Sequence, residues 1–360
     1  MTASKIYFVE EFVDNDQWKN RWISSEHESK KWEAFILSGG NLHEQLEIGK
    51  GLRTSKDGSF YAISTKFKPF TNKDKTFVLQ YSVKHEQNLT CGGAYVKVYD
   101  CNLNPRQLHQ KTSYLLMFGP DFCSPHVHKI HVIFNYRGKL VPMEWDIRWP
   151  YDKYSHLYTL IIYPNKRYTV KIDNLDVAEG TLEDDWKFLP PKKIENFKAR
   201  KPKDWDENFE IYDPSDQKPD DWDQPEYIFD KKATKPDDWN EDIDGAWEPP
   251  LVKNPAFKGP WKPRKIRNAN YKGPWIRPFI DNPDYFDDPD LYVFEEICGI
   301  GIDVWQVESG TIFDNILISD DPGEAEEHGW KIWGKIREVE RKSSSMIRKK
   351  EREHHVHDEL

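Results

Sequence analysis

Short runs of β-branched and aromatic residues alternate with turn residues through the first half of the chain. Each run is bounded by Gly, Asn, Asp or Pro, which is the pattern typical of strands in an all-β protein. The clearest runs are residues 77–83, 94–99, 131–136 and 158–163, with two more at 302–305 and 312–318. The pattern therefore predicts an all-β sandwich in which a long segment is inserted before the last strands.

The inserted segment is marked by proline and by two tryptophan repeats. Sixteen of the 24 prolines lie between Pro190 and Pro289, which disfavours helices and long strands there. Two units recur three times each, Lys-Pro-x-Asp-Trp every 17 residues and Gly-x-Trp every 14 residues. Their tryptophans are Trp205, Trp222 and Trp239, and then Trp247, Trp261 and Trp275. Three copies of each unit predict an extended hairpin arm, in which the two sets of tryptophans face each other as 205–275, 222–261 and 239–247. The alternative is a disordered linker, but linkers rarely carry regularly spaced tryptophan.

These signals predict the organisation of the chain. Residues 1–188 and 289–320 are expected to form the sandwich, residues 189–288 the proline-rich arm, and residues 321–360 a C-terminal α-helix and tail. Asp321 can cap that helix, and Pro322 suits its first turn.

Composition and charge narrow the function classes. Only 37% of the residues are hydrophobic and 32% are charged, but 14% are aromatic, which a disordered chain would not contain. No apolar run is long enough for a membrane helix. The net charge of −10 argues against nucleic-acid binding. Residues 182–250 carry 21 acidic against 11 basic side chains, so this balance belongs to the outgoing limb and tip of the arm.

The last four residues match a localisation signal. His357-Asp358-Glu359-Leu360 is a retrieval signal of the endoplasmic reticulum, which predicts a protein of that lumen. The first 15 residues have no apolar core of the signal-peptide kind, so we expect that a signal peptide is missing from this sequence. The lumen is oxidising and permits disulfides. Asn88-Leu89-Thr90 is the only N-glycosylation sequon in the chain.

The sequence resembles the calreticulin family of lectin chaperones. It resembles the soluble members more than the membrane-bound calnexins. The match runs from about residue 6 to residue 320 and includes both repeats. The segments that carry it are Lys84-His85-Glu86-Gln87-Asn88, Cys91-Gly92-Gly93-Ala94-Tyr95-Val96-Lys97, Met117-Phe118-Gly119-Pro120-Asp121, Val132-Ile133-Phe134-Asn135-Tyr136, Leu182-Glu183-Asp184-Asp185-Trp186, Trp305-Gln306-Val307 and Ser309-Gly310-Thr311-Ile312-Phe313-Asp314-Asn315. The resemblance implies a concanavalin-like jelly-roll sandwich with the arm inserted.

The resemblance also implies a sugar site. The residues expected to bind the terminal glucose of a monoglucosylated high-mannose glycan are Tyr95, Lys97, Tyr114, Asp121 and Asp303, with Met117 and Trp305 packing on the sugar ring. Lectins use such sets because polar groups take the hydroxyls while an apolar platform takes the C–H face. The alternative is that the two tyrosines only fill the surface of the sandwich.

Two further sites follow from the resemblance alone. Cys91 and Cys123 are expected to form a disulfide, which could contribute roughly 3–4 kcal/mol by closing its loop. Cys101 and Cys298 depart from the family pattern; we expect free buried thiols, with a second disulfide as the alternative.

A structural calcium ion is expected on the sandwich. Its ligands would be the Asp314 side chain, with Glu11, Ile48 and Lys50 contributing mostly carbonyl oxygens; the alternative for Asp314 is a turn or surface carboxylate.

The tip of the arm is expected to recruit a disulfide isomerase. The matching residues are Asp242, Asp244 and Trp247, although Ala246 stands where an acidic residue is usual. An acidic tip with one tryptophan suits a basic partner surface. The alternative is that Trp247 only closes the last aromatic cluster of the arm.

The leading hypothesis is a monomeric, non-enzymatic lectin chaperone. A lumenal calcium buffer is the alternative, but residues 331–360 carry nine basic against six acidic side chains, which disfavours storage of calcium in the tail. A glycosidase is disfavoured because Arg148 stands where the second catalytic carboxylate would be needed.

Overall fold

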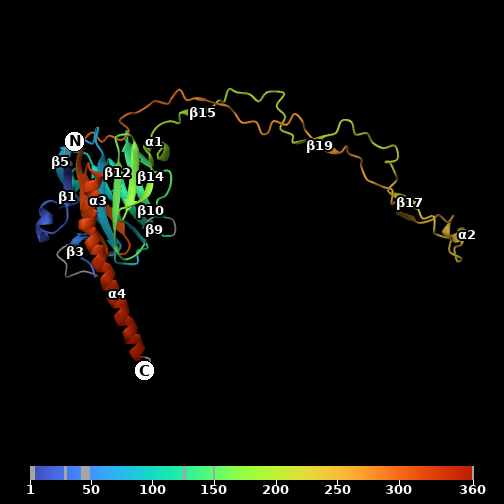
Figure 1. Cartoon of the computed structure of the whole chain (residues 1–360). Helices are drawn as coiled ribbons and strands as arrows, with labels where there is room; N and C mark the ends of the chain where they lie inside the picture. Colours follow the sequence, from blue (N-terminus) through green and yellow to red (C-terminus); the bar gives the residue numbers. More distant parts are fainter. Residues whose placement is uncertain (1–4, 28–30, 42–48, 125–126, 149–150, 359–360) are drawn as a thin grey trace. The chain divides into compact units, whose positions relative to one another are not determined.

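The computed structural model describes residues 5–27, 31–41, 49–124, 127–148 and 151–358. The chain divides into two units, residues 1–190 with 284–360, and residues 191–283 (Figure 1). The first unit contains two β-sheets and the C-terminal helices, and the second is a hairpin of two long limbs.

Within the described ranges, the first sheet has eight antiparallel strands in the order β14-β13-β12-β6-β22-β4-β3, with β1 also paired to β22. Their bounds are β1 Ile6–Glu10, β3 Ile36–Ser38, β4 Gly51–Arg53, β6 Phe77–His85, β12 Ser155–Ile162, β13 Arg167–Ile172, β14 Leu175–Thr181 and β22 Thr311–Ser319. Every residue of β6, β12 and β22 is buried, as expected for strands at the centre of a covered sheet.

Among the described residues, the second sheet also has eight strands. Their order is β11-β10-β9-β7-β21-β5-β2, with β8 paired to β21 and β9. Their bounds are β2 Ile23–Ser24, β5 Ser59–Phe70, β7 Cys91–Gly93, β8 Val96–Tyr99, β9 Leu116–Cys123, β10 Val127–Tyr136, β11 Lys139–Pro142 and β21 Ile297–Gln306. Strands β21 and β22 come after the inserted unit, yet each lies inside a sheet built from earlier strands. The predicted all-β sandwich is therefore confirmed.

Aromatic and aliphatic side chains from both sheets fill one continuous core. Its largest fully buried members include Trp22, Tyr61, Tyr81, Phe118 and Trp186. Burial of such side chains is the main stabilising term of a sandwich of this size.

The second unit is a hairpin held by three short antiparallel ladders. They are β15 Lys193–Glu195 with β20 Phe279–Asp281, β16 Glu210–Tyr212 with β19 Lys265–Arg267, and β17 Tyr227–Phe229 with β18 Leu251–Lys253. Each tryptophan of the first repeat donates its indole N–H to the glycine carbonyl of a Gly-x-Trp unit on the other limb. The pairs are Trp205–Gly273 at 2.8 Å, Trp222–Gly259 at 2.7 Å and Trp239–Gly245 at 2.9 Å. This is the order that the repeats predict.

The glycines of the second repeat have a conformational reason to be glycine. Gly245, Gly259 and Gly273 adopt φ values of 80°, 73° and 79°, a left-handed region that other residues rarely occupy. The turn at each glycine presents its carbonyl to the facing indole, so the two repeats depend on one another.

Two helices follow the last strand of the sandwich, α3 Pro322–Lys331 and α4 Trp333–Asp358. The side chain of Asp321 caps α3 by accepting hydrogen bonds from the backbone N–H groups of Gly323 (2.8 Å) and Glu324 (3.2 Å), which confirms the predicted start. The remaining short helices are α1 Leu182–Asp185, α2 Glu241–Asp244, and the 3₁₀ turns Asn15–Asn20 and Pro105–Gln107. None of the helices within the described residues is apolar over a length that would span a membrane.

The first turns of α4 are bound to the first sheet through a buried carboxylate. Glu340 is fully buried and accepts hydrogen bonds from the backbone N–H and the hydroxyl of Ser155, both at 2.8 Å. The ammonium of Lys84 lies 3.3 Å from the same carboxylate. Trp333, also buried, donates its indole N–H to the Ser155 carbonyl at 2.9 Å. This part of α4 is therefore an integral piece of the sandwich.

Candidate functional site

The second sheet has one face in the core and one face outside it. Alternate residues of a strand point to opposite faces. In β21, Ile300, Ile302 and Val304 belong to the core, so Asp303 and Trp305 point to the other face. The same alternation of apolar core residues with other residues can be seen in the sequence of β21.

Strand pairing brings the expected sugar residues of three strands together on this outer face. Lys97 of β8 is directly paired with Met117 of β9 and with Gly301 of β21. Asp303 lies two residues after Gly301 on the same face of β21. Its carboxylate contacts the Lys97 ammonium with both oxygens, at 2.7 and 2.9 Å. Residues 206 positions apart thus form a buried ion pair, with Lys97 5% and Asp303 0% exposed.

Two tyrosines pack around this ion pair. The Lys97 ammonium lies 5.6 Å from the ring centre of Tyr95 and 4.9 Å from that of Tyr114, within the range of a cation–π interaction. Burial, followed by the charge of Asp303, raises the pKa of Tyr114 to about 12. Burial also raises the pKa of Tyr95 well above its usual value, and Asp303 and Asp121 add to this. Both phenols therefore stay neutral at physiological pH and can donate a hydrogen bond.

Asp121 is the carboxylate of this set that solvent reaches. Its side chain is 26% exposed, and one oxygen lies 3.1 Å from Nε2 of His131 on the neighbouring strand β10. The ring of His131 also meets the ring of Tyr95 edge-on, with centroids 6.5 Å apart. His131 thus links Asp121 to Tyr95.

Trp305 lies two residues after Asp303, on the same face of β21. Its ring packs against Phe60 of β5 with centroids 4.3 Å apart, and Trp32 meets Phe60 edge-on at 6.2 Å. Trp305 is half-buried. The three rings form an aromatic platform on the same face as Asp303.

Several residues for which no role was predicted from the sequence also lie on this face. His131, Phe60 and Trp32 are described above, and the buried Tyr99 lies on the same face as Lys97 in β8. Burial raises the pKa of Tyr99 well above its usual value, with Asp303 as the next cause. Strand parity could have pointed to Tyr99, since it is two residues after Lys97, whereas Trp32 gave no signal because it lies outside the named strands.

Asp314, the expected calcium ligand, is a buried carboxylate in β22. It is 5% exposed, and its two oxygens accept hydrogen bonds from the backbone and side-chain N–H groups of Asn315 at 2.7 and 3.1 Å. Burial raises its pKa well above the usual value, and the negative charges of Glu11 and Glu10 raise it further. A cation bound at this carboxylate would lower its pKa and favour its charged form.

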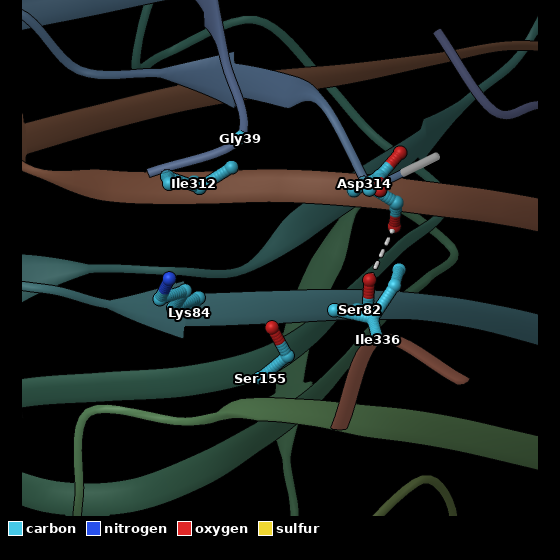
Figure 2. Close-up of a pocket in the computed structure, with 8 residues that line it drawn as sticks. Gly39, Ser82, Lys84, Ser155, Ile312, Asp314 and Ile336 are labelled. Atoms are coloured by element: carbon cyan, nitrogen blue, oxygen red, sulfur yellow. Dashed lines mark hydrogen bonds between the residues drawn. The ribbon is translucent and has the colours of Figure 1, made fainter. Parts of the chain in front are cut away.

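A small cavity adjoins Asp314 (Figure 2). It has a volume of about 10 Å³, roughly what a single water or ion centre requires. The residues that line it are Gly39, Gly49, Ser82, Lys84, Ser155, Ile312, Asp314 and Ile336. Ser82 donates its hydroxyl to the Asp314 carbonyl at 3.2 Å, so that oxygen is already engaged.

The other expected calcium ligands are placed only in part. Glu11 has one carboxylate oxygen 3.0 Å from Nε2 of His328 in α3, and its charge acts on Asp314. Lys50 is half-buried, next to Gly49 of the cavity lining. Ile48 lies outside the described residues. The oxygen chemistry of Asp314 and Glu11 fits calcium, which prefers carboxylate and carbonyl ligands.

Both pairs of cysteines form disulfides, and among the described residues there is no free cysteine. The expected bond between Cys91 and Cys123 is confirmed; it joins directly paired positions of β7 and β9. The expectation of free thiols at Cys101 and Cys298 is wrong. Their Cα atoms are 4.9 Å apart because β8 and β21 pair, which brings together residues 197 positions apart.

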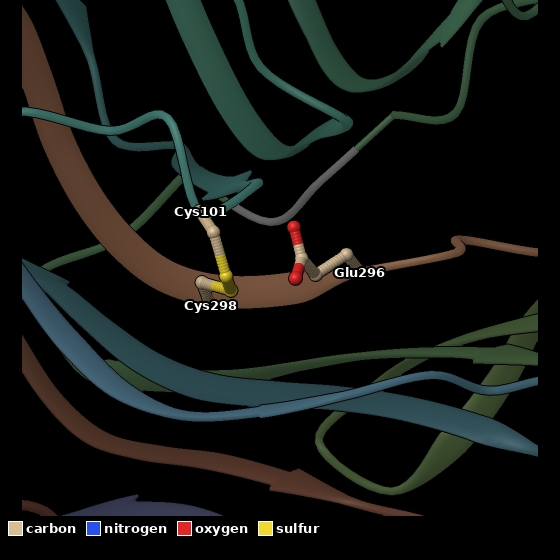
Figure 3. A group of neighbouring side chains, drawn as sticks. All are labelled: Cys101, Glu296 and Cys298. Atoms are coloured by element: carbon tan, nitrogen blue, oxygen red, sulfur yellow. A yellow bond between two sulfur atoms is a disulfide. The ribbon is translucent and has the colours of Figure 1, made fainter.

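Glu296 lies close to the second disulfide, and the three side chains have the spacing of a metal site (Figure 3). Zinc and related metals bind cysteine as thiolate. Since both sulfur atoms are bonded to each other, this cluster is a disulfide with a neighbouring carboxylate and not a metal centre.

At the tip of the arm the structure exposes one of the residues expected to bind a partner, together with a neighbouring isoleucine. Asp242 is exposed, Ile243 is 80% exposed, and Trp247 is half-buried. Asp244 ends α2, but its side chain lies outside the described set. Trp239, not Trp247, makes the indole hydrogen bond across the last turn.

Comparisons with known proteins give one consistent result. A model described as the calreticulin family matches residues 8–245 and 244–318. Calreticulin of Mus musculus is 54% identical over 336 residues, which are 93% of this chain and 80% of the relative. Calreticulin of Homo sapiens is 53% identical over the same lengths, and that of Bos taurus is 52% identical over 353 residues, covering 98% and 84%. The solved globular domain of T. cruzi calreticulin superposes with a TM-score of 0.68 at 29% identity, covering 96% of this chain and 99% of that one.

Proposed function

The chain belongs to the calreticulin family, and on this premise we propose that it is a calcium-binding lectin chaperone of the endoplasmic reticulum lumen. Membership of the family supports chaperone, lectin and calcium-binding roles in general. The finer proposal is that the protein binds monoglucosylated high-mannose N-glycans on folding glycoproteins, without hydrolysing them. Its arm would bring a folding catalyst to the bound glycoprotein, which raises the local concentration of that catalyst.

The observation that carries the lectin proposal is the buried Lys97–Asp303 ion pair between Tyr95 and Tyr114 on the outer face of the second sheet. Sugars are recognised by polar groups held in fixed positions beside an aromatic or apolar surface. The ion pair fixes the polar groups, and Met117 and Trp305 supply apolar surface beside them.

Burial suggests different tasks for the two carboxylates. Asp303 has no exposed surface, so its task would be to orient the Lys97 ammonium toward the sugar. Asp121 is partly exposed and can accept a hydrogen bond from a sugar hydroxyl directly. The neutral phenols of Tyr95 and Tyr114 would supply further donors.

A binding assay with paired variants tests this proposal. The probe is a monoglucosylated high-mannose oligosaccharide, compared with the same oligosaccharide without its glucose. Asp121→Asn keeps the shape of the side chain but removes its charge, and should weaken binding at least tenfold. Asp176→Asn, at an exposed position of β14 in the other sheet, is the matched control and should bind as the wild type does. Equal binding of both oligosaccharides, or release of glucose during incubation, would refute the proposal.

For calcium, Asp314 would be the side-chain ligand, helped by Glu11, Lys50 and Ile48. Calcium here would stabilise the sandwich. The alternative function, bulk calcium buffering, predicts tens of bound ions in equilibrium dialysis. The basic balance of residues 331–360 argues for a small number instead.

For the arm, we propose that Asp242, Asp244 and Trp247 contact a disulfide isomerase. Trp247→Ala should reduce binding of the isomerase in a pull-down of purified components. Phe197→Ala is the matched control, because Phe197 is an aromatic residue of the arm that is 74% exposed but lies outside α2 and the residues that follow it. Loss of binding in both variants would argue against a site at the tip.

A further inference from the structure

The loop between β6 and β7 contains the sequon Asn88-Leu89-Thr90, to which the proposed function assigns no task. We propose that Asn88 is a modification site that carries an N-linked oligosaccharide. The proposal goes beyond lectin activity and requires only that the chain enters the secretory lumen.

The folded structure leaves Asn88 available while it fixes both of its neighbours. The Asn88 side chain is exposed, and within the described residues no hydrogen bond of its amide is found. Leu89 is 3% exposed, and its carbonyl accepts a hydrogen bond from the hydroxyl of Tyr151 at 3.0 Å. A glycan on Asn88 would therefore replace none of the side-chain hydrogen bonds found among the described residues.

Thr90, the residue that makes the sequon recognisable, is engaged once the protein has folded. Its backbone N–H and its hydroxyl donate to the two carboxylate oxygens of Glu308, at 2.7 and 2.5 Å. Its carbonyl accepts a hydrogen bond from the backbone of Ser124 at 2.9 Å. A transferase that binds the Thr90 hydroxyl would first have to break its hydrogen bond to Glu308.

The order of synthesis removes that obstacle. Glu308 follows Thr90 by 218 residues, so it does not exist when the sequon emerges into the lumen. Cys91, next to the sequon, must also wait for Cys123, 32 residues later. The sequon is thus free during synthesis and becomes locked afterwards, which favours modification of the nascent chain.

The chemistry is a group transfer from a lipid-linked oligosaccharide. Nδ2 of Asn88 forms a bond to the anomeric carbon of the first N-acetylglucosamine, and the bond between that carbon and the lipid pyrophosphate breaks. The pyrophosphate leaves with the bonding electron pair, and the amide gives up one proton. No oxidant or metal redox step is needed.

The test expresses the full chain, preceded by a cleavable secretory leader, in eukaryotic cells. Intact-mass measurement before and after digestion with a peptide N-glycosidase should show loss of one oligosaccharide. Because that enzyme converts the modified Asn88 to aspartate, peptide mapping in heavy-oxygen water should place the label at this residue. Asn88→Gln should abolish both signals.

Two further variants separate the sequon from the fold. Both Thr90→Ala and Glu308→Ala remove the hydrogen bond between the Thr90 hydroxyl and the Glu308 carboxylate, and Glu308→Ala also removes the bond from the Thr90 backbone N–H. Only Thr90→Ala destroys the sequon. We expect no glycan on the first and a normal glycan on the second. Lys198→Thr is the positive control, because it turns Asn196-Phe197-Lys198 of the arm into a second sequon. A chain that is modified at Asn196 in this control but unmodified at Asn88 would overturn the proposal, as would a glycan that survives Asn88→Gln.

Discussion

Replacement of Asp303 by asparagine should destabilise the protein strongly, because it leaves the Lys97 ammonium buried without its counter-charge. The two groups are 2.7 Å apart and no more than 5% exposed. Removal of one partner from a buried ion pair typically costs about 3–5 kcal/mol. The rings of Tyr95 and Tyr114 still face the ammonium and offset part of the loss, so we expect about 3 kcal/mol. For a unit of this size, that corresponds to a fall in thermal midpoint of about 6–12 °C.

A double-mutant cycle measures this pair and separates stability from binding. Lys97→Met should cost a similar amount, because it leaves Asp303 as an unpaired buried carboxylate. The double variant with Asp303→Asn has no buried charge at the pair, so it should be about 2–3 kcal/mol more stable than the sum of the single effects predicts. Urea unfolding followed by circular dichroism gives these energies. We expect glycan binding to be lost in all three variants, since the ion pair that holds the Lys97 ammonium in place is gone.

Two results would refute this reasoning. If the single effects add up in the double variant, the charges do not interact as the distances indicate. If the double variant regains both stability and glycan binding, the ion pair supports the fold but has no part in the proposed sugar site. A simple replacement of Asp303 by alanine could not tell these cases apart, because unfolding and loss of the site would look alike.

Four further predictions concern other parts of the first unit. Asp314→Asn should abolish the calcium-induced rise in stability, which for the wild type is about 2.7 kcal/mol at a calcium concentration 100 times Kd; an unchanged rise would exclude Asp314 as a ligand. The same variant should be at least as stable as the wild type without calcium, because burial has raised the pKa of this carboxyl and its charged form destabilises the fold at neutral pH. Peptide mapping without reduction should recover Cys101 linked to Cys298, and free thiol at either position would contradict the structure. Glu340→Ala should release the first turns of α4, so the fluorescence of the buried Trp333 should shift to longer wavelength; an unshifted spectrum would show that the apolar contacts alone hold the helix.

Much of the fold could be predicted from local patterns. The strands are short apolar runs between turn residues. The start of α3 is predicted by Asp321, which caps the helix, and by Pro322 in its first turn. The facing order of the arm followed from two repeats of three copies each, because a hairpin with equal numbers of units permits one pairing. The strands and the helix start depend on neighbours in the sequence, and the arm pairing depends on the order of the repeats, so both can be predicted without knowledge of the sheet topology.

The site is different, because its contacts depend on which strands become neighbours. Lys97 and Asp303 are 206 residues apart, and no local sequence pattern indicates that they meet. They meet because β8 pairs with β21. The same pairing brings Cys101 to Cys298, and the expectation of free thiols failed because that register was unknown. Family resemblance supplied the sugar residues without this geometry, and so it could not show that Asp303 is wholly buried.

The burial of Asp303 changes the physical interpretation of the face. A buried ion pair adds little net stability compared with an apolar pair of similar size, so stability alone gives little reason for its presence here. What the pair does is hold one ammonium between two neutral phenols, at distances that the cross-linked strands β8 and β21 keep fixed. Polar groups that are already in place lose less entropy when a sugar binds, and the sugar then need not order them. On the proposed function, the sugar site would be complete before its ligand arrives, and this would offset the cost of the buried ion pair in the free state.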